Sequence, residues 1–412
     1  MRKFRSRTLA LALTAVALLA AGCGSGPAKS NSLKLYNDKA AWTPYYKQVS
    51  AQAKQEAGVT VNPVGYADEP TYQAFVKSAL KTRVKPDLFT WATGPLLSQL
   101  VESGDVGDTS ALWSKAIRQG DLPQQLEQYY TVGGKQYCVP ENVSYWVMFY
   151  NKSVFAENGI TVPTSWSGLM DAAAKLKQSG RTPFYQTNVL FSFVWFQILL
   201  AGNDPDLYDK LVQGKASYTD PGVVDAMKQW RDMIGKGYMS DAGDKTDPAT
   251  LLKSGKVAMV PDGTWFNTSM TQAGEKPGKD YGMFVIPKVN PSLAKTPVPV
   301  ETGALCTAGK SSNSAAIDKF TTWWTTPAAQ TRWSTSRGDV SANPKVTIPD
   351  PGLNTLTKQV TGTDYQLVDR YFDAVSPAVL TAALDGFGAF MADPDSYQKQ
   401  LTAMQKVAAS GS

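Results

Sequence analysis

The feature that most constrains the fold is an alternation of short strands and helices near the start of the chain. Apolar, extended segments at 33–36, 59–64 and 86–91 are separated by 42–57 and 70–79, where apolar residues recur at helical spacing. This strand–helix–strand–helix–strand order predicts a parallel sheet covered by helices on both faces. Ligands bind such sheets beyond the carboxyl ends of the strands. We therefore expect an α/β fold with a ligand site at that edge.

Polar and aromatic residues follow two of these predicted strands. Asn37, Asp38 and Lys39 come directly after the first strand, and Trp91 and Gly94 lie at the end of the third. Because the carboxyl ends of parallel strands share one edge, we expect these residues to contact a ligand. The alternative is a solvated polar loop and a tryptophan of the core.

A second candidate site lies where an apolar run ends in a turn. Residues 256–260 have the pattern of a buried strand, which we expect to end at Pro261, just before Asp262 and Gly263. Trp265 follows, and it would offer a flat apolar face with the Asp262 carboxylate and the Gly263 amide beside it. A sugar ring, which is apolar on its faces and bears hydroxyls at its rim, suits that arrangement. The alternative is a core tryptophan after an ordinary turn.

The composition excludes several classes of function. The chain of 412 residues is long enough for two domains, and it contains no histidine. Ser-His-Asp or Cys-His catalysis and histidine-ligated metal are therefore excluded. Without the first 22 residues, 37 basic side chains face 35 acidic ones and no basic run is present, which argues against a nucleic-acid partner. We expect no cofactor and no metal.

The N-terminus has the pattern of a lipoprotein signal peptide. A basic segment precedes the thirteen-residue run Leu9–Ala21, which is too short to span a bilayer as a helix. The run leads into Leu-Ala-Ala-Gly-Cys23, which resembles the bacterial lipobox, although Ala20 stands where that pattern prefers leucine. We expect residues 1–22 to be removed, a lipid to be attached to Cys23, and residues 23–32 to form a flexible tether. The alternative is a plain secretory signal followed by a chance cysteine.

Three blocks of the chain resemble a known family, the extracellular solute-binding proteins of carbohydrate ABC importers, in the maltose-binding-like group called family 1. The blocks are Tyr137–Trp166, Lys256–Trp265 and Glu301–Asn343, and with the lipobox the likeness covers nearly the whole mature chain. The resemblance implies a two-lobed periplasmic-binding-protein-like fold, in which each lobe is an α/β sandwich and hinge strands join the two. It also implies that ligand lies in the cleft between the lobes and that lobe closure signals to the membrane permease.

The resemblance divides the chain between the lobes. The first α/β lobe would contain residues 33–142 plus 304–342, and the second 143–303 plus 343–412. The apolar run 191–200 is expected to form a buried helix of the second lobe, and the tail from Leu367 to Ala409 to form two or three helices.

Further ligand contacts are expected from the second lobe and the crossings. Tyr145 and Trp146 lie at the second-lobe entry, where the family places a ligand contact, and alternation along a strand sends them to opposite faces. Gly303 lies at the return crossing. Asp385 and Phe387 are expected in a glycine-flanked break between two helices.

The implied function is that of a receptor rather than an enzyme. A monomer anchored by its lipid outside the cytoplasmic membrane would capture a disaccharide to tetrasaccharide and deliver it to the ABC permease. It would touch the membrane through the anchor alone. One alternative is a surface glycan hydrolase that uses two carboxylates, with Glu141 and Asp262 as the suspected pair. A further alternative is an adhesion or scaffold lipoprotein.

The two remaining cysteines, Cys138 and Cys306, lie near the two crossings. The family's hinge topology would bring their strands close together, so that a disulfide could form in an oxidising compartment. Two buried free thiols on adjacent strands are the alternative.

Overall fold

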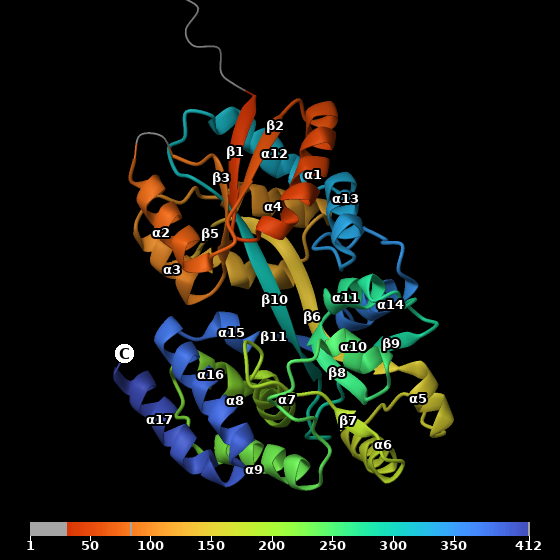
Figure 1. Ribbon diagram of the computed structural model, residues 1–412. Coiled ribbons are helices and arrows are strands. Elements are labelled where there is room, and N and C mark those ends of the chain that lie inside the picture. Colours follow the sequence, from red (N-terminus) through yellow and green to blue (C-terminus); the bar gives the residue numbers. More distant parts are fainter. Residues whose placement is uncertain (1–30, 83–84, 411–412) are drawn as a thin grey trace, which may run out of the picture.

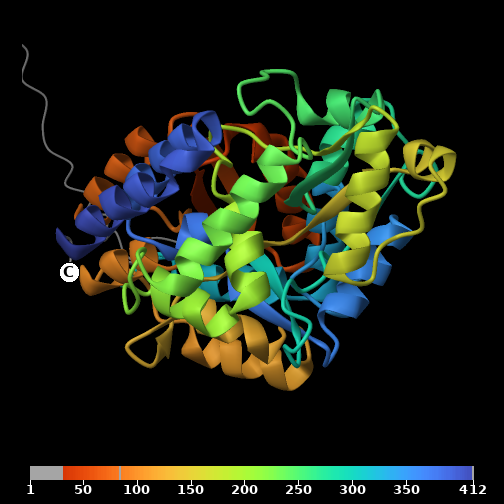
Figure 2. The same ribbon diagram turned by 90° about the horizontal axis from the view of Figure 1, so that it is seen from below.

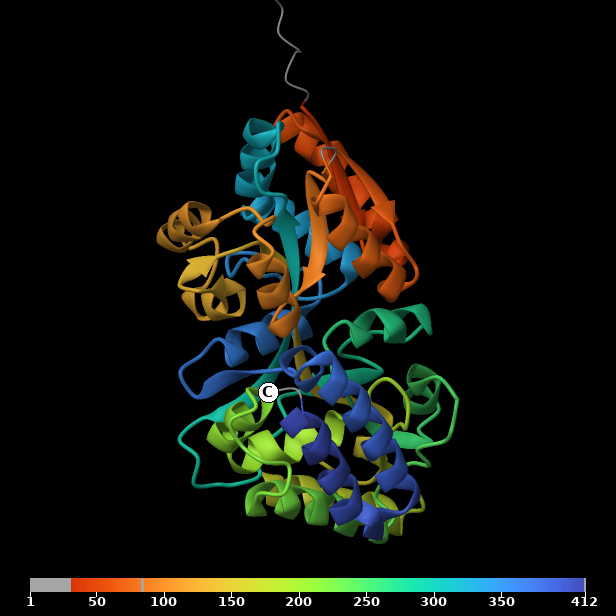
Figure 3. The ribbon, with the colours of Figure 1, turned by 90° about the vertical axis from the view of Figure 1, so that its left-hand side faces the viewer.

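The computed structural model describes residues 31–82 and 85–410, which form two α/β lobes joined by two long strands (Figure 1). The predicted signal peptide 1–22, the predicted lipidation site Cys23 and all but the last two residues of the predicted tether 23–32 lie outside the described residues. Figure 3 shows the lobes stacked along the length of the joining strands. No helix within the described ranges combines the length and the apolar character that a membrane crossing requires.

The first lobe is built on the expected parallel strands. β1 (Ser32–Asn37) pairs in parallel with β2 (Thr60–Gly65) on one side and β3 (Leu88–Ala92) on the other. The alternation predicted from the sequence is therefore confirmed. The helical and short extended elements of this part are η1 (Ala40–Trp42), α1 (Thr43–Glu56), α2 (Glu69–Leu80), α3 (Pro95–Glu102), α4 (Ser110–Gln119), η2 (Gln124–Tyr130), β4 (Thr131–Val132) and β5 (Lys135–Gln136).

Two antiparallel strands, β6 (Val139–Asn151) and β10 (Thr296–Thr307), run from one lobe into the other. Every residue of β6 except Tyr150 is buried, and its second half, from Tyr145 to Tyr150, is wholly apolar or aromatic. β10 pairs with β3 at one end and with β11 (Tyr365–Asp369) at the other, so a single nine-stranded sheet passes through both lobes.

The second lobe surrounds the other end of this sheet. β8 (Val257–Gly263) pairs with β6 and with β7 (Thr182–Phe184), and β9 (Tyr281–Phe284) pairs with β6. The buried helix expected near 191–200 is α7 (Val194–Asn203), which packs against α9 (Pro221–Gly235). Figure 2, seen from below, shows the green helices of this lobe beside the blue C-terminal helices. The other helices are α5 (Lys152–Glu157), α6 (Trp166–Gln178), α8 (Pro205–Val212), α9 (Pro221–Gly235), α10 (Pro248–Lys253), α11 (Phe266–Gln272), α15 (Tyr371–Ala374), α16 (Pro377–Ala392), η3 (Pro394–Ser396) and α17 (Tyr397–Ser410).

The chain crosses between the lobes a third time. After β10, helices α12 (Ser314–Trp324) and α13 (Pro327–Arg337) pack on α1, and the chain then returns to α14 (Pro351–Val360), beside β9 and β11. Asp339 fixes this return, because its buried carboxylate accepts hydrogen bonds from Ser144 on β6 at 2.5 Å and Thr264 after β8 at 2.6 Å.

Three local expectations were wrong. β8 does not end at Pro261 but runs through Gly263, because Pro261 lies opposite Met148 of β6 and the ladder continues past it. The segment 365–369, in which helix was expected from Leu367, is the strand β11. The chain does not break around Asp385: α16 is continuous there, and its glycines serve close packing, since a Cβ on Gly386 would lie 2.4 Å from Met404 Cε of α17.

Candidate ligand-binding cleft

A cavity of about 570 Å³ lies where residues from both lobes and from β10 converge. Among the residues predicted from the sequence, Asp38, Lys39, Trp91, Trp265 and Gly303 line it. The other lining residues are Glu69, Pro70, Gln73, Ala92, Leu96, Asn142, Leu190, Phe191, Glu301, Thr302, Arg370, Phe372, Asp373, Val375, Pro377, Leu380 and Thr381.

Trp265 is held in position at this cavity by two aromatic neighbours and a hydrogen bond. It lies directly before α11, its ring packs edge-on against Trp146 at 6.3 Å between centroids, and Phe191 packs beside it at 5.8 Å. Its indole N–H donates to Glu301 at 3.1 Å. The ring is only partly buried, so it is both fixed and accessible to a ligand.

The guanidinium of Arg370 holds two acids at the cavity. Its Nε and Nη2 donate to the two oxygens of Asp373 at 2.7 and 2.8 Å, and Nη1 donates to Glu301 at 2.8 Å. Burial alone would lower the pKa of Arg370, but the two carboxylates outweigh it and raise the pKa. Burial raises the pKa of Asp373, although Arg370 opposes this. The cluster is thus internally paired.

Lys39, which follows β1 in the first lobe, pairs with acids at the cavity as Arg370 does in the second lobe. Its ammonium contacts Asp38 at 3.0 Å and the buried carboxylate of Glu141 at 3.5 Å, while Thr90 donates to Asp38 at 2.6 Å. Burial alone would raise the pKa of Asp38, but Lys39 and Thr90 outweigh it and lower the pKa. Glu141 also accepts a short hydrogen bond from Tyr46, and burial raises its pKa. Asp38 and Lys39 therefore lie at the cavity as a fixed pair.

Four of the predicted residues lie outside the lining of this cavity. Asn37 is buried and donates to the carbonyl of Val64 at 3.2 Å. Gly94 faces the other lobe, where a Cβ would lie 2.3 Å from the carbonyl oxygen of Asp373. Tyr145 and Trp146 are both buried, in different core clusters, as strand alternation predicts, and Trp146 supports the ring of Trp265 from behind.

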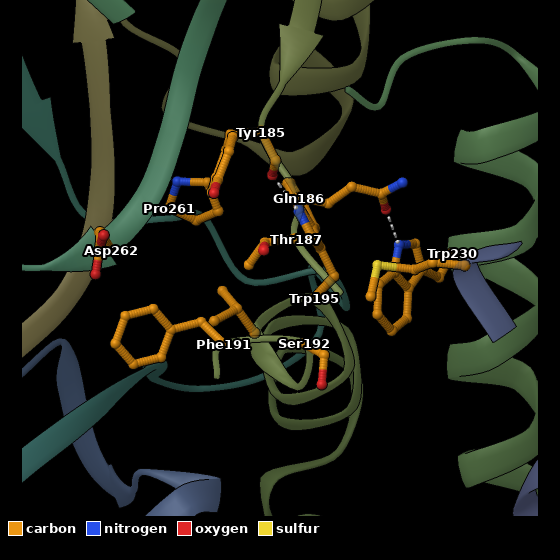
Figure 4. A pocket seen from close by; sticks show the side chains of 11 residues that line it. Tyr185, Gln186, Thr187, Phe191, Ser192, Trp195, Trp230, Pro261 and Asp262 are labelled. Carbon is orange, nitrogen blue, oxygen red and sulfur yellow. Dashed lines mark hydrogen bonds between the residues drawn. The ribbon is translucent and has the colours of Figure 1, made fainter. Parts of the chain in front are cut away.

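The remaining second-lobe candidates are also separate from the cavity. Asp262 is buried beside a small enclosed space between β8 and the start of α7 (Figure 4), and burial raises its pKa well above the usual range. Gly263 is buried and donates its amide to Asp262 at 2.8 Å. Asp385 is exposed and lines a shallow groove with Leu190, whereas Phe387 is fully buried against Phe196.

The carboxylate pair suspected for a hydrolase is not assembled. Asp262 lies opposite Val147 of β6, six residues along that strand from Glu141. At about 3.3 Å per residue the two positions are roughly 20 Å apart along the strand. A glycosidase requires its two carboxyl groups within about 5–10 Å of each other. In addition, Glu141 is fully buried and engaged by Lys39 and Tyr46.

Sequence reasoning missed the charged centre of the cleft. Glu301 and Arg370 line the cavity with Asp373, and none of the three was predicted as a site residue. Arg370 directly follows β11, so it lies at a strand end, as Asp38 and Lys39 do. The same rule would have found it if 365–369 had been recognised as a strand.

The fold and the cleft define a class of protein: a two-lobed α/β protein with a cavity between its lobes. A model of the family described as bacterial extracellular solute-binding protein matches residues 48–356. The chain belongs to this family.

Individual relatives agree with this assignment. The multiple sugar-binding protein of Streptococcus mutans is 23% identical over 274 residues, which are 58% of this chain and 63% of that protein. A binding protein of Brucella abortus is 27% identical over 161 residues, 37% of this chain. The chain thus spans 38% of the length of the Brucella relative and somewhat less than two thirds of the streptococcal one.

Solved structures share the fold along almost the whole chain. The bacterial solute receptor AcbH, described as having an exclusive preference for β-D-galactopyranose, superimposes with a TM-score of 0.78 at 21% identity, covering 92% of this chain and 98% of that one. The solute-binding protein RafE in complex with raffinose superimposes with a TM-score of 0.71 at 18% identity, again with 92% and 98% coverage.

Proposed function

We propose that this chain is the carbohydrate receptor of an ABC importer, that it captures a disaccharide to tetrasaccharide in the interlobe cleft, and that it delivers the sugar intact to the permease. One observation carries the proposal. The partly exposed ring of Trp265 stands beside the Glu301–Arg370 pair in a cavity of about 570 Å³. An apolar plate with polar groups at its edge matches a sugar ring, and the volume lies within the range of about 300–1,000 Å³ usual for small-ligand sites.

The same proposal includes the division of the chain into lobes, its location and its lack of enzymatic activity. The first lobe comprises residues 33–142 plus 304–342 and the second 143–303 plus 343–412, with the ligand between them. The chain acts as a monomer outside the cytoplasmic membrane, held there by a lipid on Cys23 after removal of residues 1–22, and it carries out no chemistry. The names of the streptococcal relative and of the solved structures of AcbH and RafE support a sugar as the ligand. The separation of Glu141 from Asp262 speaks against hydrolysis by that pair.

Calorimetric titration of the soluble form, made without Cys23, tests the proposal. The panel is galactose, raffinose, xylobiose, N,N′-diacetylchitobiose and maltotriose, and the sugar is analysed after each titration. We expect saturable one-to-one binding of an oligosaccharide that is recovered intact. Absence of binding across the panel, in heat and in thermal shift, would contradict the receptor function, and recovery of cleaved sugar would instead establish the hydrolase.

A further inference from the structure

The floor of the cleft contains a buried polar side chain without a partner. Asn142 is 3% exposed and lines the cavity, yet neither its Oδ1 nor its Nδ2 has a hydrogen-bond partner within residues 31–82 and 85–410. A buried amide left unpaired destabilises a folded protein, so native proteins rarely keep one without a reason. Because this amide lines the cavity of the proposed site, a bound ligand could provide its missing hydrogen-bond partners.

The backbone opposite Asn142 leaves space for its side-chain amide. Asn142 lies opposite Gly303 of β10, at an irregularity in the β6–β10 pairing. A Cβ on Gly303 would lie 2.2 Å from Asn142 Oδ1 and 2.7 Å from Glu141 Oε2. Only glycine therefore leaves room for the Asn142 side chain in its present position. Gly303, a predicted site residue, thus contributes by having no side chain, which leaves space for the Asn142 amide.

The cations of the cleft are already neutralised. All three hydrogen bonds of Arg370 go to Asp373 and Glu301, and Lys39 is held by Asp38 and Glu141. The lining contains two cations, Lys39 and Arg370, against four acids, Asp38, Glu69, Glu301 and Asp373. An anionic ligand would meet an excess of negative charge and no free cation among these groups.

We propose that the Asn142 amide, given room by Gly303, is a specificity-determining contact that takes a pair of hydroxyls of a neutral sugar and disfavours uronic acids and sugar phosphates. The amide presents an NH2 donor group and a carbonyl acceptor side by side, and two adjacent hydroxyls can bond to both groups. A carboxylate or phosphate only accepts, so it would leave Oδ1 unpaired and place its charge beside the acids. This inference rests on the proposed function.

The test uses Asn142→Leu and the nearly isosteric Asn142→Asp, with Asn62→Leu, an exposed asparagine on β2, as the matched control. Each variant is titrated with the neutral sugar of the panel that wild type binds best, and melted without ligand. We expect Asn142→Leu and Asn142→Asp to lose affinity about tenfold or more, because donor and acceptor are lost in the first and the donor in the second. Asn142→Leu should melt without ligand at the wild-type temperature or above it, since it removes an unpaired buried amide.

The two readouts separate a binding role from a structural one. A merely structural Asn142 would lower the ligand-free melting temperature of Asn142→Leu, and that result would overturn the inference. So would a loss of affinity smaller than tenfold in both variants, or tighter binding of digalacturonate or glucose 1-phosphate than of the neutral sugar by wild type. If wild type binds nothing in the neutral panel, the proposed function itself has failed, which is visible without any variant.

Discussion

The indole N–H of Trp265 donates to the carboxylate of Glu301 at 3.1 Å, and the same oxygen accepts from Arg370 at 2.8 Å. This shared oxygen ties the residue before α11 to the hinge strand β10 and to the residue that follows β11. The ring is therefore oriented before any ligand arrives. Such preorganisation reduces the ordering that binding would otherwise require.

Trp265→Ala should weaken binding of the preferred sugar. Loss of the apolar contact is worth about 1.5–3 kcal/mol, or roughly 10–150-fold in the dissociation constant. Trp265→Phe keeps a smaller aromatic face and loses the bond to Glu301, so its loss of affinity should be smaller than that of Trp265→Ala. Calorimetric titration of the two variants measures the difference. Wild-type affinity in a correctly folded Trp265→Ala protein would show that the ring does not contact the sugar.

Arg370→Met should destabilise the protein, because it leaves the carboxylates of Glu301 and Asp373 unpaired at the cavity. Breaking such a pair costs about 3–5 kcal/mol when it is buried, and less where water reaches it. Arg231→Met removes only surface contacts, with Asp232, Asp395 and the ring of Tyr397, so it should change the free energy of unfolding by less than about 0.5 kcal/mol. Urea unfolding of both variants makes the comparison.

The Arg370→Met defect should also depend on pH. Arg370 opposes the rise in the pKa of Asp373 that burial causes, so its removal raises that pKa further. A carboxyl group whose pKa is higher in the folded than in the unfolded state binds more protons when folded, and stability then increases as pH falls. The variant should recover part of its loss between pH 7 and pH 5. A constant difference from wild type across that range would contradict this account.

The sequence predicted the fold better than it predicted the cleft. Local patterns sufficed for β1, β2, β3 and α7, because strand and helix periodicity is read from consecutive residues. Asp38 and Lys39 were predicted from the rule that ligands bind beyond the carboxyl ends of parallel strands, and Trp265 from the turn that follows an apolar run. The structure places all three at the cavity. Arg370 was missed because β11 is short and only partly buried, so its apolar pattern is weak.

Other errors came from long-range packing, which no local pattern contains. Gly386 and Gly388 looked like a break, yet α16 is continuous there, and Gly386 allows it to approach Met404 of α17 closely. Asp262 looked like a ligand contact, but the β6–β8 ladder buries it. Asn142 could not be predicted as a site residue from its own segment of sequence. Its lack of a hydrogen-bond partner becomes visible only when the pairing of β6 with β10 is known.

Gly94→Ala should disturb the contact between the lobes. Gly94 has φ +67°, and a Cβ there would lie 2.3 Å from the carbonyl oxygen of Asp373. Gly58 is the matched control, because it has φ +68° with nothing within 4 Å of the added Cβ. Both variants place a Cβ at positive φ, which costs of order 1 kcal/mol in the left-handed region. The strain is larger at Gly94, whose ψ is −145°, and only Gly94→Ala adds the collision. We expect only Gly94→Ala to weaken sugar binding and to increase the radius of gyration in X-ray scattering. Equal behaviour of the two variants would contradict the contact.

The structure contains the disulfide between Cys138 and Cys306, with 4.1 Å between the Cα atoms and 168 residues of sequence separation. Both residues are fully buried. Closing so long a loop should stabilise the protein by up to roughly 5 kcal/mol. The double variant Cys138→Ala/Cys306→Ala should unfold at lower urea and bind sugar with nearly unchanged affinity, because neither cysteine lines the cavity. An unchanged urea midpoint, or two free thiols in the denatured, unreduced chain made without Cys23, would contradict the role of the bond.

Asp369, at the end of β11, should make the protein less stable as pH rises through the range from about 4 to 7. Burial, with Asp209 and Asp373 nearby, raises the pKa of Asp369 from 3.8 to about 7, and burial raises that of Asp209 to about 6. Below pH 4 the Asp369 carboxyl is protonated in both states and contributes no difference. Between pH 4 and pH 7 the unfolded chain releases this proton while the folded chain retains it, so the free energy of unfolding falls, and above pH 7 the loss is complete.

Asp369→Asn removes this ionisation, so its stability should equal that of wild type near pH 4 and exceed it at pH 8. After solvent screening we expect a gain on the order of 1–2 kcal/mol. Asp395→Asn is the control, because the Asp395 side chain is 90% exposed and its replacement should leave the pH dependence as it is. Urea unfolding of the three proteins at pH 4, 6 and 8 measures the slopes. If Asp369→Asn loses stability between pH 4 and 8 as steeply as wild type does, Asp369 is not the group that titrates.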